Sequence, residues 1–192
     1  MLTGSQEIFP TKIFRYQLKS HQDLKDKYLK DMIESYEECR YDKPDGWLCD
    51  KISTSFNQHE QIIKEVPDEY AKIVDELMDR KWEGKFDFWH NVYKNGDSQE
   101  GHHHLPAWWS GIHFLKFNKE EHKAPVFLDP ARLAKGFSNS GALSSLEQFV
   151  PEVREGDFIV FPSYLEHCVP AGHYNDYRVT IAVNLRVNQC SV

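Results

Sequence analysis

Hydrophobic positions in the first 82 residues recur at helical spacing. After Ser20, a residue type that often precedes a helix, apolar side chains repeat every three or four residues as far as Tyr36. A second stripe follows Pro67 and consists of Tyr70, Ile73, Val74, Leu77 and Met78. The pattern predicts two helices, so residues 1–82 are expected to form mainly helical support.

From Trp82 onward the hydrophobic period changes to the alternation that is typical of strands. Five segments separated by turn residues show this alternation: FDFWHNVY, WWSGIHFLKF, APVFLDP, GDFIVFP and YRVTIAVNLRV. Helices followed by a run of strands favour an α+β fold in which the helices brace a sheet, sandwich or barrel. We expect one domain over residues 1–192, with its β core in residues 83–192. Residues 131–150 are small and polar, which predicts a long surface or binding loop.

Composition and charge narrow the class of protein. A chain of 192 residues with a formal net charge of −7 is long enough for one well-buried domain, and its acidic balance argues against a nucleic-acid partner. No apolar run approaches the roughly 20 residues of a membrane span, so no membrane partner is expected and the predicted location is the cytoplasm. The cysteines are expected to be reduced because their spacing fits neither a metal site nor a disulfide scaffold; they are Cys39, Cys49, Cys168 and Cys190.

A histidine triplet in GHHHLPAWW is the first sign of chemistry. Side chains alternate along a strand, so His102 and His104 are expected to point one way and His103 the other. A third ligand comes from His167, which follows the apolar strand GDFIVFP. Three nitrogens on one side of a cation leave its other positions open, as catalysis requires. The histidines without such an arrangement are expected to be structural: His21, His59, His90, His113, His122 and His173.

The segments around these histidines resemble a known family. YKNGDSQEGHHH is similar to the motif that opens the iron site of oxygenases using Fe(II) and 2-oxoglutarate, and GDFIVFPSYLEHCVP is similar to the segment that carries their distal histidine. The resemblance covers residues 89–187 and, more loosely, residues 8–14. It implies a double-stranded β-helix (jelly-roll) core braced by N-terminal helices.

The resemblance also implies roles for individual residues. Iron would be held by His102, His104 and His167. An arginine about ten residues beyond the distal histidine, commonly followed by Ser or Thr, holds the far carboxylate of 2-oxoglutarate in this family; Arg178 and Thr180 occupy those positions. Alternation along a strand puts both on one face, where a guanidinium and a hydroxyl can meet one carboxylate. Further candidates for contact with cofactor or substrate are Tyr93, Gln99 and Asn91.

The implied reaction is hydroxylation of a small-molecule or peptidyl substrate by O2, with succinate and CO2 as co-products. The chain departs from the wider family at His104, where the usual third ligand is a carboxylate. A neutral imidazole leaves the site one negative charge short and should weaken Fe(II) binding. An acid from elsewhere could complete the site, and the candidates near in sequence are Asp97, Glu100, Asp129 and Asp157.

Residues flanking these motifs carry weaker expectations. Trp108, Trp109 and His113 are expected in the core or in the pocket wall. Asn184 and Arg186 continue the strand face of Arg178, which predicts a place at the pocket mouth.

Two other classes of function remain open at this stage. GDSQEGHHH and GDFIVFPSYLEH also fit the cupin motifs, which favours a three-histidine metal dioxygenase that does not use 2-oxoglutarate. The glutamate of that motif is absent, since LPAWW follows His104, and Arg178 then has no role. A third hypothesis is a catalytically inactive metal-binding barrel. Succinate formation distinguishes the first hypothesis from both. No motif specifies the substrate or the oligomeric state.

Overall fold

The computed structural model describes residues 10–39, 67–78, 81–131 and 148–190. Cys49, His59 and most of the predicted loop 131–150 lie outside these ranges. In chain order the elements are β1 (Phe14–Gln17), α1 (His21–Cys39), α2 (Asp68–Leu77), β2 (Trp82–Tyr93), β3 (Gln99–His102), β4 (Trp109–Lys116), β5 (Val126–Leu128), β6 (Gln148–Phe149), β7 (Asp157–Pro162), β8 (His167–Val169) and β9 (Arg178–Cys190).

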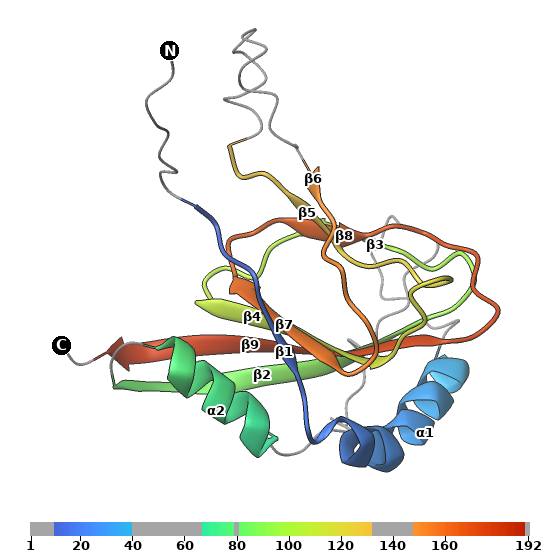
Figure 1. Cartoon of the computed structure of the whole chain (residues 1–192), viewed down its shortest axis with the longest axis horizontal. Helices are drawn as coiled ribbons and strands as arrows, with labels where there is room; N and C mark the ends of the chain where they lie inside the picture. Colours follow the sequence, from blue (N-terminus) through green and yellow to red (C-terminus); the bar gives the residue numbers. More distant parts are fainter. Residues whose placement is uncertain (1–9, 40–66, 79–80, 132–147, 191–192) are drawn as a thin grey trace, which may run out of the picture.

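Two antiparallel sheets face each other to form the body of the protein (Figure 1). The larger sheet has the order β1-β7-β4-β9-β2, and the smaller has the order β3-β8-β5-β6. Helices α1 and α2 cover the side of the larger sheet that faces away from the smaller one (Figure 1). This arrangement confirms the predicted α+β jelly-roll with bracing helices. Within the described ranges, no helix has the length and apolar character needed to cross a bilayer.

An apolar cluster joins the helices to the outer face of the larger sheet. Tyr70 of α2 stacks on Phe158 of β7, with ring centroids 4.5 Å apart. Gly111 of β4 makes room for Phe158, because a Cβ at this position would lie 2.6 Å from that ring. Ser20 directly precedes α1 as predicted, and its hydroxyl donates to Glu69 of α2 at 2.6 Å. The two predicted helices are therefore fixed to each other as well as to the sheet.

Strand β1 was not predicted from the sequence. It pairs antiparallel with β7, from Phe14 opposite Val160 to Gln17 opposite Asp157. It thereby forms one edge of the larger sheet within the segment expected to be mainly helical. A four-residue strand depends on this pairing with a partner far away in sequence, which its own pattern does not reveal.

A chain of hydrogen bonds runs through the same helix–sheet interface. His113 is fully buried; its Nδ1 lies 2.6 Å from the Tyr70 hydroxyl and its Nε2 lies 3.0 Å from Nδ1 of His21. At the far end of this chain, Nε2 of His21 lies 3.6 Å from a carboxylate oxygen of Glu155, which is within ion-pair distance. Burial lowers the pKa of His113 to about 3. His113 therefore belongs to the core between sheet and helices and is neutral at pH 7.

We expect this buried histidine to make the protein sensitive to acid. Below about pH 6.5 the unfolded chain binds a proton at residue 113 that the folded protein excludes. The free energy of unfolding therefore decreases as the pH is lowered. Between pH 7.5 and 5.0 this difference amounts to about 2 kcal/mol. Urea unfolding at both pH values should show that His113→Gln, which does not titrate, loses less stability than the wild type. Equal losses in the two proteins would contradict the expectation.

Candidate functional site

The three predicted metal ligands meet at the junction of β3 and β8. His102 ends β3, His167 begins β8, and the two residues lie opposite each other in the pairing of these strands. Their ring centroids are 4.4 Å apart, and the ring of His104 lies 4.8 Å from His102 and 5.1 Å from His167. One nitrogen from each of the three residues can be chosen so that all lie within 4.8 Å of one another. This spacing suits a shared metal ion.

The geometry of the triplet differs in one respect from the expected strand. β3 ends at His102, so His104 lies in the following loop, where its backbone N–H donates to the carbonyl of Ser163 at 2.9 Å. This link to the turn after β7 holds His104 beside His167. His103 is exposed, as alternation predicted, although the chain here is no longer a strand.

Hydrogen bonds at the outer ring nitrogens orient two of the ligands. Nδ1 of His102 lies 2.8 Å from the carbonyl oxygen of Glu100, and Nδ1 of His167 lies 3.0 Å from that of Leu165. A carbonyl only accepts, so each Nδ1 carries the proton and each Nε2 keeps a lone pair for a metal. Burial lowers the pKa of His167 to about 4 and that of His104 to about 3. The imidazoles are therefore neutral, as metal ligation requires.

No carboxylate joins this cluster among the residues that the structure describes. Three of the candidate acids accept hydrogen bonds from nearby backbone N–H groups instead: Asp97, Asp129 and Asp157. Glu100 contributes its main-chain carbonyl, which holds His102. The donor set within the described chain is thus three neutral nitrogens.

Arg178 lies in the same pocket as a buried cation. It is 1% exposed, and its Nε donates to the carbonyl of Lys123 at 2.9 Å. Its guanidinium lies over the ring of Tyr93 at 4.6 Å and near Phe114 and Phe117 at 5.8 and 6.0 Å. Nη1 is buried and has no hydrogen-bond partner among the residues that the structure describes. Because a buried, unpaired donor on a cation is costly, this group is suited to an anionic ligand.

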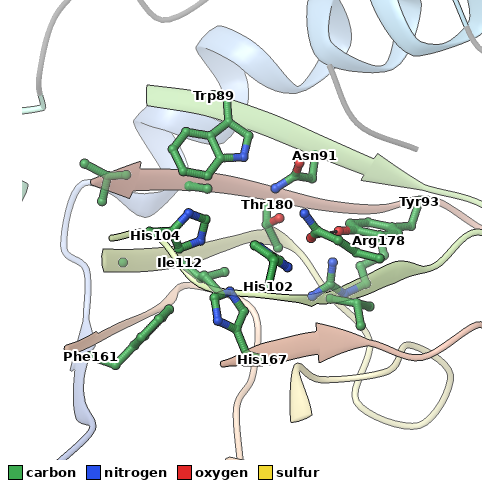
Figure 2. Close-up of a pocket in the computed structure, with 15 residues that line it drawn as sticks. Trp89, Asn91, Tyr93, His102, His104, Ile112, Phe161, His167, Arg178 and Thr180 are labelled. Atoms are coloured by element: carbon green, nitrogen blue, oxygen red, sulfur yellow. Dashed lines mark hydrogen bonds between the residues drawn. The ribbon is translucent and has the colours of Figure 1, made fainter. Parts of the chain in front are cut away.

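The remaining predicted residues surround this arginine (Figure 2). Figure 2 shows His104 on one side of the pocket and Arg178 and Tyr93 on the other, with His102 and Thr180 between them. The hydroxyl of Tyr93 donates to Oε1 of Gln99 at 2.8 Å. Thr180 is 1% exposed. All eight residues to which the sequence assigned contact with metal, cofactor or substrate therefore line one pocket.

Comparison with protein-family models gives a match over residues 87–184, more than half of the chain, to the family described as "Putative 2OG-Fe(II) oxygenase". The chain belongs to the 2OG-Fe(II) oxygenase family. Its cofactors are Fe(II) and 2-oxoglutarate, for which the neutral imidazoles and the buried arginine are suitable partners. Comparison with curated protein sequences gives no match.

Solved structures share the fold of this oxygenase at low sequence identity. The α-ketoglutarate-dependent epimerase SnoN from nogalamycin biosynthesis matches with a TM-score of 0.64 and 10% identity, over 92% of this chain and 78% of that one. AviO1 from Streptomyces viridochromogenes Tue57 matches with a TM-score of 0.60 and 12% identity, over 95% of this chain and 92% of that one. HygX from Streptomyces hygroscopicus was solved with nickel and 2-oxoglutarate bound. It matches with a TM-score of 0.55 and 9% identity, over 91% of this chain and 82% of that one.

Some matched proteins are longer than this oxygenase. The chain spans 50% of an oxidoreductase of the 2OG-Fe(II) oxygenase family from Burkholderia pseudomallei and 48% of EvdMO1.

Residues that flank the pocket of the oxygenase depart from expectation in part. Trp108 is 48% exposed, so it is not a core residue, whereas Trp109 packs against the cluster beneath the helices. Asn184 is buried and accepts a hydrogen bond from Ser110 at 2.7 Å.

Trp89 lines the pocket with its ring centroid 5.3 Å from that of His104, and the sequence did not single it out. The signal was present, because Trp89, Asn91 and Tyr93 alternate along β2. An aromatic residue in a strand predicts core equally well, so the alternation alone did not mark Trp89 as a pocket residue.

Proposed function

We propose that this oxygenase is a 2-oxoglutarate- and Fe(II)-dependent dioxygenase that hydroxylates a small-molecule or peptidyl substrate and releases succinate and CO2. In this proposal His102, His104 and His167 hold the iron. Arg178 and Thr180 hold the far carboxylate of 2-oxoglutarate, beside Tyr93 and Gln99. The observation that carries the proposal is the open Nη1 of the buried Arg178 in the pocket that the three imidazoles line.

When bound, Fe(II) and 2-oxoglutarate supply oxidative decarboxylation, in which one oxygen atom of O2 enters succinate and the other enters a substrate C–H bond. The chain itself supplies position and shelter. The three imidazoles would hold the metal, and three protein ligands would leave further positions for 2-oxoglutarate and O2. Arg178 offers a charge-assisted pair to the far carboxylate and so fixes the direction of the cofactor. Phe161 and Ile112 line the same pocket and help to exclude water.

The ligand set has a further consequence for the metal. Three neutral imidazoles leave the iron with its full positive charge, where a carboxylate ligand would cancel part of it. We therefore expect weaker retention of Fe(II) and stronger attraction for the dianionic 2-oxoglutarate. The cupin-like alternative would use the same three histidines without 2-oxoglutarate, but it assigns no ligand to the buried Arg178 in the same pocket.

Anaerobic titration of the purified protein with Fe(II) and 2-oxoglutarate tests the proposal. The expected result is a weak visible absorption band that requires both additions, followed by succinate release when O2 is admitted. Fe(II) bound without such a band, at saturating 2-oxoglutarate, would overturn the proposal in favour of the cupin-like dioxygenase or the inactive barrel. Zn(II) in place of Fe(II) is the control, because its filled d shell gives no such band.

A further inference from the structure

The inner face of the larger sheet can be followed row by row along β2 and β9. Tyr93 lies opposite Arg178, Asn91 opposite Thr180 and Trp89 opposite Ala182. All six residues line the pocket. The rows nearest Arg178 thus hold the proposed cofactor contacts, and the Trp89 row lies beside His104.

The same face continues beyond the pocket for two more rows. Asp87 lies opposite Asn184, and Lys85 lies opposite Arg186. On the other side of β9, β4 pairs Trp109 with Leu185, and the backbone N–H of Trp108 donates to the carbonyl of Leu185 at 2.9 Å. The exposed Trp108 directly precedes β4, and this hydrogen bond places its backbone beside Leu185, the neighbour of Arg186 in β9.

Neighbouring residues in the described chain bind only one of the three guanidinium nitrogens of Arg186. Its Nε donates to Asp87, and no hydrogen bond from its two Nη atoms is found within the described chain. The Arg186 side chain is 40% exposed, and Lys85 also contacts Asp87, at 3.3 Å. Two cations against one carboxylate leave this end of the face positive, although the whole chain carries −7. The free Nη pair is the part of a guanidinium that binds a carboxylate with two parallel hydrogen bonds.

The distance between Arg186 and the proposed metal ligands limits the length of a substrate that reaches both. The Trp89 row marks the place of the metal ligands, because the ring centroids of Trp89 and His104 are 5.3 Å apart. Four residues of strand separate Arg186 from Ala182 in the Trp89 row, which is about 13 Å. A long arginine side chain covers part of this distance. A molecule with one ring and a short chain would span the remainder.

From these rows we propose that Arg186 binds a carboxylate of the substrate, and that the substrate is a small-molecule carboxylate whose flat apolar body lies between Trp108 and Trp89. The inference rests on the proposed function, because it names the substrate class of the same site. Arg178 and Arg186 then divide the two anions between opposite ends of one sheet face. The cofactor's far carboxylate goes to the buried end and the substrate's carboxylate to the exposed end.

Matched acid and amide probes test this assignment. The probes are phenylacetate, 3-phenylpropionate and indole-3-acetate, each beside its primary amide, added to the anaerobic protein loaded with Fe(II) and 2-oxoglutarate. Binding is followed by the change in the visible band. The expected result is that at least one acid binds about tenfold or more tightly than its amide, which corresponds to one charge-assisted contact. In Arg186→Gln the acid and amide should bind within about twofold of each other, while Arg186→Lys keeps an intermediate preference.

A control variant and a second measurement keep the result decisive. Arg154→Gln removes an exposed arginine from the segment before β7 and should leave the preference for the acid unchanged. The inference is overturned if no probe alters the band, if acids and amides bind alike in the wild type, or if Arg186→Gln keeps the preference. Failure of the band to form at all would count against the proposed function instead. Calorimetry with the same pairs on metal-free protein would then still report whether Arg186 selects the acid.

Discussion

Replacing His167 by alanine is expected to abolish iron binding at micromolar Fe(II) and, with it, succinate formation. His167 is 3% exposed, and its Nδ1 is held by the carbonyl of Leu165, so Nε2 is fixed toward the other two imidazoles. A site with three neutral ligands and no carboxylate among the described residues has no reserve donor. We expect a loss in Fe(II) affinity of about 100-fold or more, of the size found when the shell around a metal is disrupted. Anaerobic equilibrium dialysis with metal analysis measures it.

The triplet itself offers the matched control for this experiment. His103 is exposed and lies between two proposed ligands, so His103→Ala makes the same substitution at the neighbouring position. It should keep one equivalent of Fe(II) and full turnover. If His167→Ala retained the metal, or if His103→Ala lost it, the assignment of ligands would be wrong. Thermal unfolding of both variants checks that each is folded.

Replacing Arg178 by glutamine is expected to raise the concentration of 2-oxoglutarate needed for half-saturation by about 100-fold, with Fe(II) binding retained. Truncating one partner of a buried, hydrogen-bonded charge pair costs about 2–5 kcal/mol, and each 1.4 kcal/mol is about tenfold in affinity. Glutamine keeps a polar side chain but offers neither the charge nor the fork of donors. The anaerobic band measured against 2-oxoglutarate concentration gives the value directly.

Arg186→Gln is the control for this substitution because it makes the same change on the same strand, β9. It should leave the affinity for 2-oxoglutarate within about twofold of the wild type, since Arg186 lies eight residues beyond Arg178, about 26 Å along the strand. Arg178→Gln also breaks the bond to the Lys123 carbonyl, so a modest loss of stability is expected. An unchanged half-saturation in folded Arg178→Gln would contradict a role of Arg178 in cofactor binding.

Local spacing explains why the pocket residues could be predicted together. Arg178 and Thr180 share one face because they are two apart on a strand, and the sequence shows both the alternation and the strand. His167 follows the buried apolar strand β7 after a short turn and begins β8. Predictions of this kind need no knowledge of distant contacts. They concern which side chains share a cavity, and their roles in chemistry stay predictions.

The missed features depend on contacts between distant segments. β1 is a strand because it pairs with β7, about 140 residues later. Trp108 directly precedes β4 and is 48% exposed. His104 reaches the pocket through a loop that is held by Ser163, rather than through strand alternation. Alternation predicted that His104 shares a site with His102, and both line the pocket. The cause differs, because His104 follows the end of β3.

Arg178 donates to the main-chain carbonyl of residue 123. This determines which substitutions near the pocket leave Arg178 in place. Any amino acid at position 123 has the same backbone carbonyl, so a substitution there keeps the hydrogen bond to the guanidinium of Arg178. Position in space matters instead, and it is set by the turn in which the backbone N–H and Nδ1 of His122 both bond to Asn118. The segment before β5 therefore tolerates substitution at residue 123 but not a change of length, since one inserted or deleted residue would carry the acceptor away.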